Sequence, residues 1–183
     1  MQSGHQDAGI PVTQADSRLT IGPLLSGVGG SHYDGILSQA AFDLTGTAMS
    51  VEAVTPPSAD TQADMMFTVT VDNPHHYRIY VEAGFLRFER KTAALGKEGL
   101  GPLLAFDAAT HAYWRIRHRP ATDEVVFETA PRVHGSAGAW VEHARTPRTF
   151  AVTAVKVELK AGTWRSESTA PGSVQFDSVT VVR

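Results

Sequence analysis

The chain has 183 residues, of which 42% are hydrophobic and 19% charged, as is typical of a single soluble globular domain. A net charge of -3 and a pI near 6.2 argue against a sequence-independent nucleic-acid binder, which would carry a basic excess, so we expect no nucleic-acid partner. The sequence contains no cysteine, which excludes disulfides and thiolate metal sites.

The polar opening stretch predicts a flexible N-terminal tail or linker over residues 1–17, followed by one domain over residues 18–183. This stretch lacks the basic and apolar regions of a signal peptide. No apolar run reaches the roughly 20 residues that a membrane-spanning helix needs. We therefore expect neither a signal peptide in this sequence nor membrane insertion.

Short apolar or alternating runs, separated by Gly, Pro, Asn and Asp, predict strands along the rest of the chain. The expected strands are Arg18–Ile21, Gly35–Phe42, Ala48–Val54, Ala63–Asp72, Tyr77–Ala83, Phe85–Arg90, Leu103–Asp107, Ala112–Arg119, Val125–Thr129, Ala151–Lys160 and Val174–Val182. Thr92–Gly101 contains three glycines and ends before Pro102, so we expect a loop or a single turn there. The fold class that follows is all-β.

Two hairpins have specific turn chemistry. Ala83-Gly84 separates two strand patterns at a place where a tight hairpin needs positive φ. A turn built from Pro120, Thr122 and Asp123 separates the expected strands Ala112–Arg119 and Val125–Thr129. Both turns predict antiparallel neighbours.

Apolar and polar residues alternate through these hairpins, and in a strand they point to opposite faces. The apolar positions, which we expect to face the core, are Tyr77, Ile79, Val81, Leu86, Phe88, Trp114, Ile116, Val125 and Phe127. The other face carries Arg78, Tyr80, Glu82, Arg87, Glu89, Tyr113, Arg115, Arg117, Glu124, Val126 and Glu128. If these strands share a sheet, the polar set makes a single charged face. That face is either a ladder of cross-strand ion pairs or a platform for a polar ligand.

Several sequence blocks resemble, in order, the concanavalin A-like lectin/glucanase jelly-roll domains that occur as accessory modules of secreted bacterial proteins and in phage minor tail proteins. The blocks are YDGILSQAAFDLTG, VDNPHHYRIYVEAG, AATHAYWRIRH, FETAP, VELKAGTW and PGSVQFDSVTV. The resemblance implies a two-sheet antiparallel β-sandwich of the jelly-roll type. The chain departs from the family in its longer loop after Thr129 and in lacking an Asp-rich first strand.

The resemblance also implies a non-catalytic carbohydrate-binding or adhesion module, outside the cell or on a cell or virion surface. Its partner would be a polysaccharide or a cell-surface glycan. Because tyrosine can stack on a sugar and arginine can bind two acceptors at once, the candidate ligand-binding residues are Arg78, Tyr80, Tyr113, Arg115 and Arg117. Trp140 and Trp164 follow glycine-containing turns and are either a loop site or packed core anchors. A structural or protein-interaction module is the alternative function.

Relatives of this fold that hydrolyse glycosides use two carboxylates, usually written Glu-x-Asp-x-x-Glu. No glutamate in this chain is followed two positions later by aspartate. We therefore expect no enzymatic activity, and a divergent glycoside hydrolase is the weaker alternative.

Jelly-roll domains resembling this one often contain a structural calcium ion held by carboxylates and carbonyls. Asp177, in the segment QFDSVTV, matches the closing-strand aspartate of that pattern and is the candidate Ca²⁺ ligand. The alternative is that Asp177 hydrogen-bonds to the backbone at a strand turn.

Overall fold

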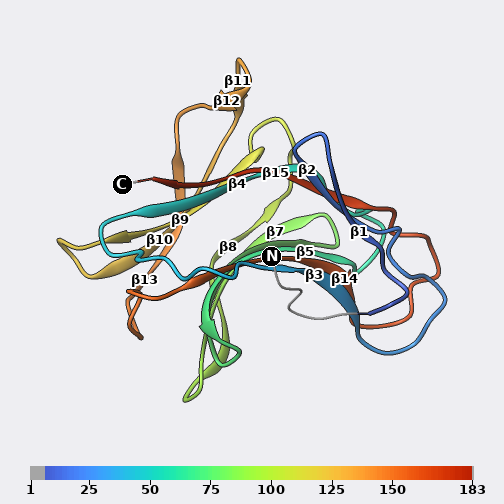
Figure 1. Cartoon of the computed structure of the whole chain (residues 1–183), viewed down its shortest axis with the longest axis horizontal. Helices are drawn as coiled ribbons and strands as arrows, with labels where there is room; N and C mark the ends of the chain where they lie inside the picture. Colours follow the sequence, from blue (N-terminus) through green and yellow to red (C-terminus); the bar gives the residue numbers. More distant parts are fainter. Residues whose placement is uncertain (1–6, 183) are drawn as a thin grey trace.

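The computed structural model describes residues 7–182, which form two antiparallel sheets that face each other across a common core (Figure 1). No helix occurs within these residues, so none in that range crosses a membrane. The structure confirms the predicted all-β class and the two-sheet antiparallel β-sandwich.

The seven-stranded sheet has the order β1 (Val12–Ala15), β2 (Arg18–Ile21), β15 (Val174–Val182), β4 (Ala48–Thr55), β9 (Tyr113–Arg119), β10 (Glu124–Ala130) and β13 (Val141–Pro147). The six-stranded sheet has the order β3 (His32–Leu37), β14 (Lys156–Thr163), β5 (Asp64–Asp72), β6 (His75–Glu82), β7 (Phe85–Thr92) and β8 (Gly96–Ala105). A small ribbon of β11 (Arg132–Val133) and β12 (Ser136–Ala137) projects from the seven-stranded sheet (Figure 1).

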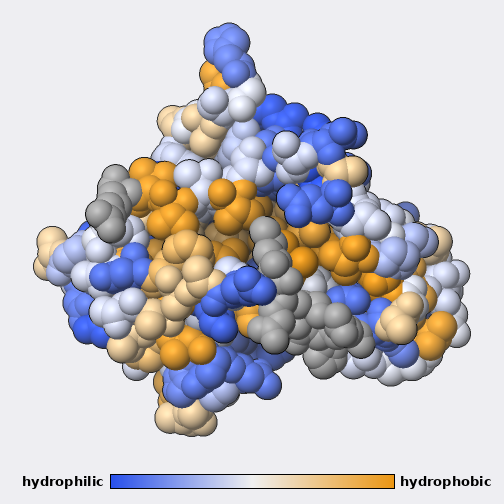
Figure 2. All heavy atoms as spheres, viewed as in Figure 1, coloured by the Kyte–Doolittle hydropathy of each residue, from blue (hydrophilic) through white to orange (hydrophobic). Residues whose placement is uncertain are grey.

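The core lies between the sheets and follows the predicted alternation. Every apolar position named from the hairpins exposes 2% or less of its surface. Trp114 from β9 packs edge-on against Phe176 from β15, with ring centroids 6.4 Å apart. Figure 2 shows hydrophobic residues gathered in a band across the middle of the molecule, where the two sheets of Figure 1 meet. Burial of these side chains, at about 25 cal/mol per Å², is the main force that holds the sandwich together.

Both predicted hairpins are present. Ala83 and Gly84 have φ values of 52° and 73° and join β6 to β7 with Glu82 opposite Phe85. Two consecutive residues with positive φ match the right-handed twist of the flanking strands. Asp123, with φ of 52°, lies in the turn that joins β9 to β10.

The expected loop over Thr92–Gly101 is wrong in its second half, where residues from Gly96 onward belong to β8 and pair with β7. Glycines weaken a strand, but β8 is an edge strand that pairs on one side only and stays exposed, so it can contain them. The exposed strands β1 and β13 and the ribbon β11–β12 were not predicted either, because none of them shows strong alternation.

The expected tail over residues 1–17 also differs from the structure. Residues 1–6 lie outside the described residues, but Val12–Ala15 pairs with β2, and Ile10 exposes only 2% of its surface. The N–H of Gly22 donates to the carbonyl of Pro11 at 2.9 Å. The sandwich therefore includes residues before position 18, because an added strand satisfies the backbone groups at the edge of β2.

The single polar face expected from the hairpins is divided between two sheets. Arg78 and Tyr80 lie on the outer face of the six-stranded sheet, whereas Tyr113, Arg115 and Arg117 lie on the outer face of the seven-stranded sheet. Alternation determines on which side of a strand a residue lies, but it carries no information on which strands pair. The chain crosses between β8 and β9 from one sheet to the other.

Candidate binding site

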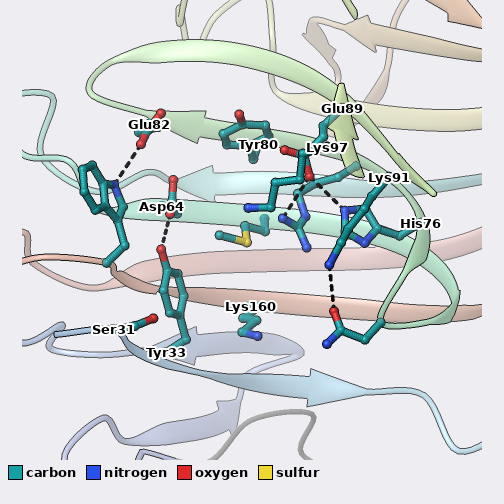
Figure 3. A pocket seen from close by; sticks show the side chains of 14 residues that line it. Ser31, Tyr33, Asp64, His76, Tyr80, Glu82, Glu89, Lys91, Lys97 and Lys160 are labelled. Atoms are coloured by element: carbon teal, nitrogen blue, oxygen red, sulfur yellow. Dashed lines mark hydrogen bonds and ion pairs between the residues drawn. The ribbon is translucent and has the colours of Figure 1, made fainter. Parts of the chain in front are cut away.

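A hollow with a volume of about 590 Å³ lies on the outer face of the six-stranded sheet. Every strand of this sheet contributes at least one lining side chain. In Figure 3 Tyr33, Asp64 and Glu82 lie toward one end of the cavity, and His76, Lys91 and Lys97 lie toward the other. The register agrees, since Asp64 is opposite Glu82 and Lys91 is opposite both His76 and Lys97.

Arg78 is held in the cavity by a buried glutamate. It lies opposite Glu89 on β7, and its Nη1 donates to Glu89 Oε1 at 3.3 Å while its Nε donates to Thr68 Oγ1 at 3.0 Å. His76 Nε2 lies 2.8 Å from the same Glu89 oxygen. These contacts hold the guanidinium in one orientation before any ligand arrives.

The charges of this cluster follow from its burial. Burial alone would raise the pKa of Glu89, but the hydrogen bond with His76 and the positive charge of Arg78 outweigh that effect and lower it. Burial lowers the pKa of His76, which favours the neutral imidazole. Glu89 is thus an anion whose charge is already balanced by Arg78.

Tyr33 and Asp64 form a second buried pair at the other end of the cavity. The Tyr33 hydroxyl donates to Asp64 Oδ2 across strand β14, over Gly162, which lies opposite both residues. A Cβ atom at position 162 would lie 2.6 Å from a ring carbon of Tyr33, so only glycine leaves room for this contact. Burial raises the pKa of Asp64 to about 7, although the hydrogen bond from Tyr33 acts in the opposite direction.

Two further aromatic residues line the cavity. Trp164 exposes 48% of its surface, and its Nε1 donates to Glu82 Oε1 at 3.1 Å. Arg87 Nη2 lies 3.2 Å from the other oxygen of Glu82. Burial raises the pKa of Tyr80 to about 12, so its phenol is neutral. Each ring combines an apolar face with a polar group, which suits recognition of a sugar.

The other predicted ligand residues, Tyr113, Arg115 and Arg117, contact neighbouring groups of the protein. Nε of Arg115 and of Arg117 lie 2.6 and 3.0 Å from Glu128 Oε2, and Glu128 exposes only 4% of its surface. The Arg115 guanidinium lies 4.0 Å from the ring centroid of Trp140. Tyr113 donates through its hydroxyl to the carbonyl of Gly135 in the β11–β12 turn at 3.2 Å. This face is therefore a ladder of cross-strand pairs, partly covered by the loop after Thr129.

The residues around Asp177 do not fit a calcium ion. Asp177 Oδ1 accepts hydrogen bonds from the backbone N–H and the hydroxyl of Ser178, and Oδ2 lies 3.6 Å from Arg18 Nε. Calcium takes six to eight oxygen ligands, but within residues 7–182 no group of three or more His, Asp or Glu side chains is arranged to hold a metal ion. Arg18, whose side chain is about half exposed, supplies a positive charge beside this carboxylate.

Arg78 and Tyr80 are the predicted site residues that the cavity brings together. Tyr33, Asp64, His76 and the lysines of the cavity were missed, and Trp164 was named only as an alternative. The alternation of Lys160 with buried Leu159 and Ala161 places it on an outer face, and this signal was available from the sequence. The sequence offered no signal for the approach of Tyr33 to Asp64, because this contact depends on the pairing of β3 with β14.

No protein-family model and no curated protein matches the sequence. Among solved structures, the chain is similar to a legume lectin-like domain from Entamoeba histolytica, with a TM-score of 0.61 and 8% identity over 95% of this chain and 87% of that one. A functionally unknown protein from Saccharomyces cerevisiae has a TM-score of 0.58 and 12% identity, over 94% and 91% of the two chains. The CBM2 module of the Lactobacillus casei BL23 phage J-1 evolved Dit has a TM-score of 0.56 and 8% identity, over 93% and 78%. At such low identity the likeness shows the fold alone, a lectin-like jelly roll.

Proposed function

We propose that this protein is a non-catalytic carbohydrate-binding module that holds a polysaccharide or a cell-surface glycan in the cavity of the six-stranded sheet. The observation that carries the proposal is the combination, in one cavity of about 590 Å³, of a prearranged arginine, Arg78, with the rings of Tyr80 and Trp164. Aromatic rings pack against the apolar face of a sugar, and a guanidinium donates to two hydroxyls at once.

The fold supports the proposal, since one solved structure with the same architecture is named a legume lectin-like domain and another a CBM2 module. The setting that suits such a module is adhesion outside the cell or at a cell or virion surface, because polysaccharides and cell-surface glycans occur there. The carboxylates of the cavity support a non-catalytic role. Glu89, Glu82 and Asp64 each accept a hydrogen bond from a neighbouring side chain.

The proposal is tested by replacing Arg78 and measuring glycan affinity by calorimetry across a panel of polysaccharides. We expect Arg78→Ala to weaken binding at least about tenfold, since an arginine held inside a binding site is a typical hot spot. Arg117→Ala is the matched control, because Arg117 also pairs with a buried glutamate but lies on the other sheet. Equal affinities of the two variants for every bound glycan would rule out this cavity as the binding site.

The same panel tests the alternative functions. If no polysaccharide binds the unaltered protein, the carbohydrate-binding proposal fails and a structural or protein-interaction role replaces it. Release of oligosaccharides from laminarin, xylan or alginate, abolished by Asp64→Asn, would overturn the non-catalytic proposal.

A further inference from the structure

All four lysines of the chain lie in the six-stranded sheet, at positions 91, 97, 156 and 160. Lys91 belongs to β7, Lys97 to β8, and Lys156 and Lys160 to β14. Three of them line the cavity, while Lys156 does not. In a chain with a net charge of -3, this positive charge is a local feature and not a general property of the surface.

Lys91 and Lys97 face each other directly across the β7–β8 pairing. Like charges directly opposite each other destabilise a sheet. The Nζ of Lys91 donates a hydrogen bond to Asn73 Oδ1 at 3.1 Å, and this neutral acceptor does not cancel the charge of the lysine. Within residues 7–182 no carboxylate forms an ion pair with either lysine. The pair thus carries two positive charges with no direct ion-pair partner among the described residues, although the charge of Lys97 also acts on the carboxylate of Glu89.

The nearby acidic side chains are engaged elsewhere. Glu89 is shared by His76 and Arg78, and Glu82 by Arg87 and Trp164. Lys160 lines the same hollow, with its Nζ 5.4 Å from the ring centroid of Tyr33 and 4.0 Å from Glu158 Oε1. One end of the cavity is therefore basic, whereas the other presents Trp164 and the buried Tyr33–Asp64 pair.

We propose, as a refinement that rests on the proposed function, that the glycan is anionic and that its carboxylate or sulfate group binds between Lys91 and Lys97. The anion removes the repulsion between the two ammonium groups and gains charge-assisted hydrogen bonds from both. The sugar ring that carries it then lies over the middle of the cavity, beside Arg78 and Tyr80. Polysaccharides of uronic acids and sulfated glycans share this chemistry.

The experiment compares the double variant Lys91→Gln/Lys97→Gln with Lys156→Gln, which removes a lysine from the same sheet outside the cavity. The probes are two matched pairs: polygalacturonate with its methyl ester, and dextran sulfate with dextran. We expect the unaltered protein to bind a charged member of a pair more tightly than its neutral partner, and more weakly as salt is added. The double variant should lose about tenfold in affinity for the charged polymer, and Lys156→Gln should not.

The outcomes separate this inference from the proposed function. Equal binding of charged and neutral polymers, unchanged in the double variant, overturns the anionic ligand but leaves carbohydrate binding in place. Binding of poly-glutamate as tightly as the charged glycans overturns recognition of the sugar. Preference for polygalacturonate over dextran sulfate, or the reverse, identifies the anionic group. Urea unfolding controls for folding, since removal of two facing like charges should leave the double variant at least as stable as the unaltered protein.

Discussion

Trp140 and Trp164 follow similar glycine-containing turns, but the structure places them in different environments. Trp140 stacks on the Arg115 guanidinium and holds the loop after Thr129 against the seven-stranded sheet. Trp164 exposes 48% of its surface in the cavity of the other sheet and is bound by Glu82 through its indole nitrogen. Neither ring belongs to the main core. Trp140, which packs on the sheet, should therefore contribute more to stability, and the more exposed Trp164 more to binding.

We expect Trp164→Ala to weaken glycan binding by a factor of about 2 to 13, the range for an aromatic contact of roughly 0.5–1.5 kcal/mol, while changing the free energy of unfolding by less than about 0.5 kcal/mol. Trp140→Ala should lower the free energy of unfolding by about 1 kcal/mol, through loss of the cation–π contact, and leave affinity unchanged. Calorimetry and urea unfolding of both variants measure the two effects. The reversed pattern would contradict this assignment.

Asp64 makes stability depend on pH. Its pKa is about 7 in the folded protein, against an ordinary value of 3.8, so the folded state keeps a proton that the unfolded chain releases. The contribution of this proton to the free energy of unfolding is fully present below pH 3.8, the ordinary pKa of the group. It is lost as the pH rises through the folded pKa of about 7. Asp64→Asn keeps an oxygen that can accept the Tyr33 hydrogen bond but does not titrate.

As the pH rises from 5 to 8, the unaltered protein should therefore lose about 2–3 kcal/mol of unfolding free energy relative to the Asp64→Asn variant, at roughly 1.4 kcal/mol per pKa unit. Urea unfolding at a series of pH values measures this difference. Asp60→Asn removes a carboxyl group at an exposed position before β5 and controls for the substitution itself. A difference for Asp64→Asn that does not change with pH would show that Asp64 is ionised throughout this range.

At the scale of strands, prediction from the sequence succeeded where one face of a strand is buried. The hairpins β6–β7 and β9–β10 each have an apolar side, and the residues predicted to lie on it are in the core as expected. Prediction failed for β1, for β13 and for the first part of β8, which lie at sheet edges, because exposed strands need no apolar stripe. An edge strand forms where the adjacent strand has unpaired backbone N–H and C=O groups. The alternation pattern of one segment contains no information on the strand that will lie beside it.

The candidate site was only half predictable for a related reason. Arg78 and Tyr80 were recognised as a polar pair on one strand, which alternation alone can show. Their separation from Arg115 depends on the crossover between β8 and β9, and local sequence does not encode it. The pairing of Tyr33 with Asp64 requires three strands in the order β3, β14, β5 and a glycine in the middle one. Such contacts follow from topology and not from any single segment.

At the scale of the molecule, the two sheets share one core but have unlike outer faces. The seven-stranded sheet pairs Arg115 and Arg117 with Glu128. The loop that carries the β11–β12 ribbon (Figure 1) contacts this sheet through Trp140 and Gly135. The six-stranded sheet has an open cavity with its charges unevenly distributed. A ligand that recognises the protein through charge and ring stacking should therefore contact one face only.

Lysine acetylation in the presence of a bound glycan can show which face is covered, because every lysine of the chain lies on the six-stranded sheet. We expect a saturating glycan to slow the acetylation of Lys91, Lys97 and Lys160 at least about fivefold, as measured by peptide mass spectrometry, since the ligand excludes the reagent and engages their ammonium groups. Lys156 begins the strand that also carries Lys160, lies outside the cavity and should react at an unchanged rate. Equal protection of all four lysines would indicate a general tightening of the sheet, and protection of Arg145 from phenylglyoxal would place the ligand on the opposite face.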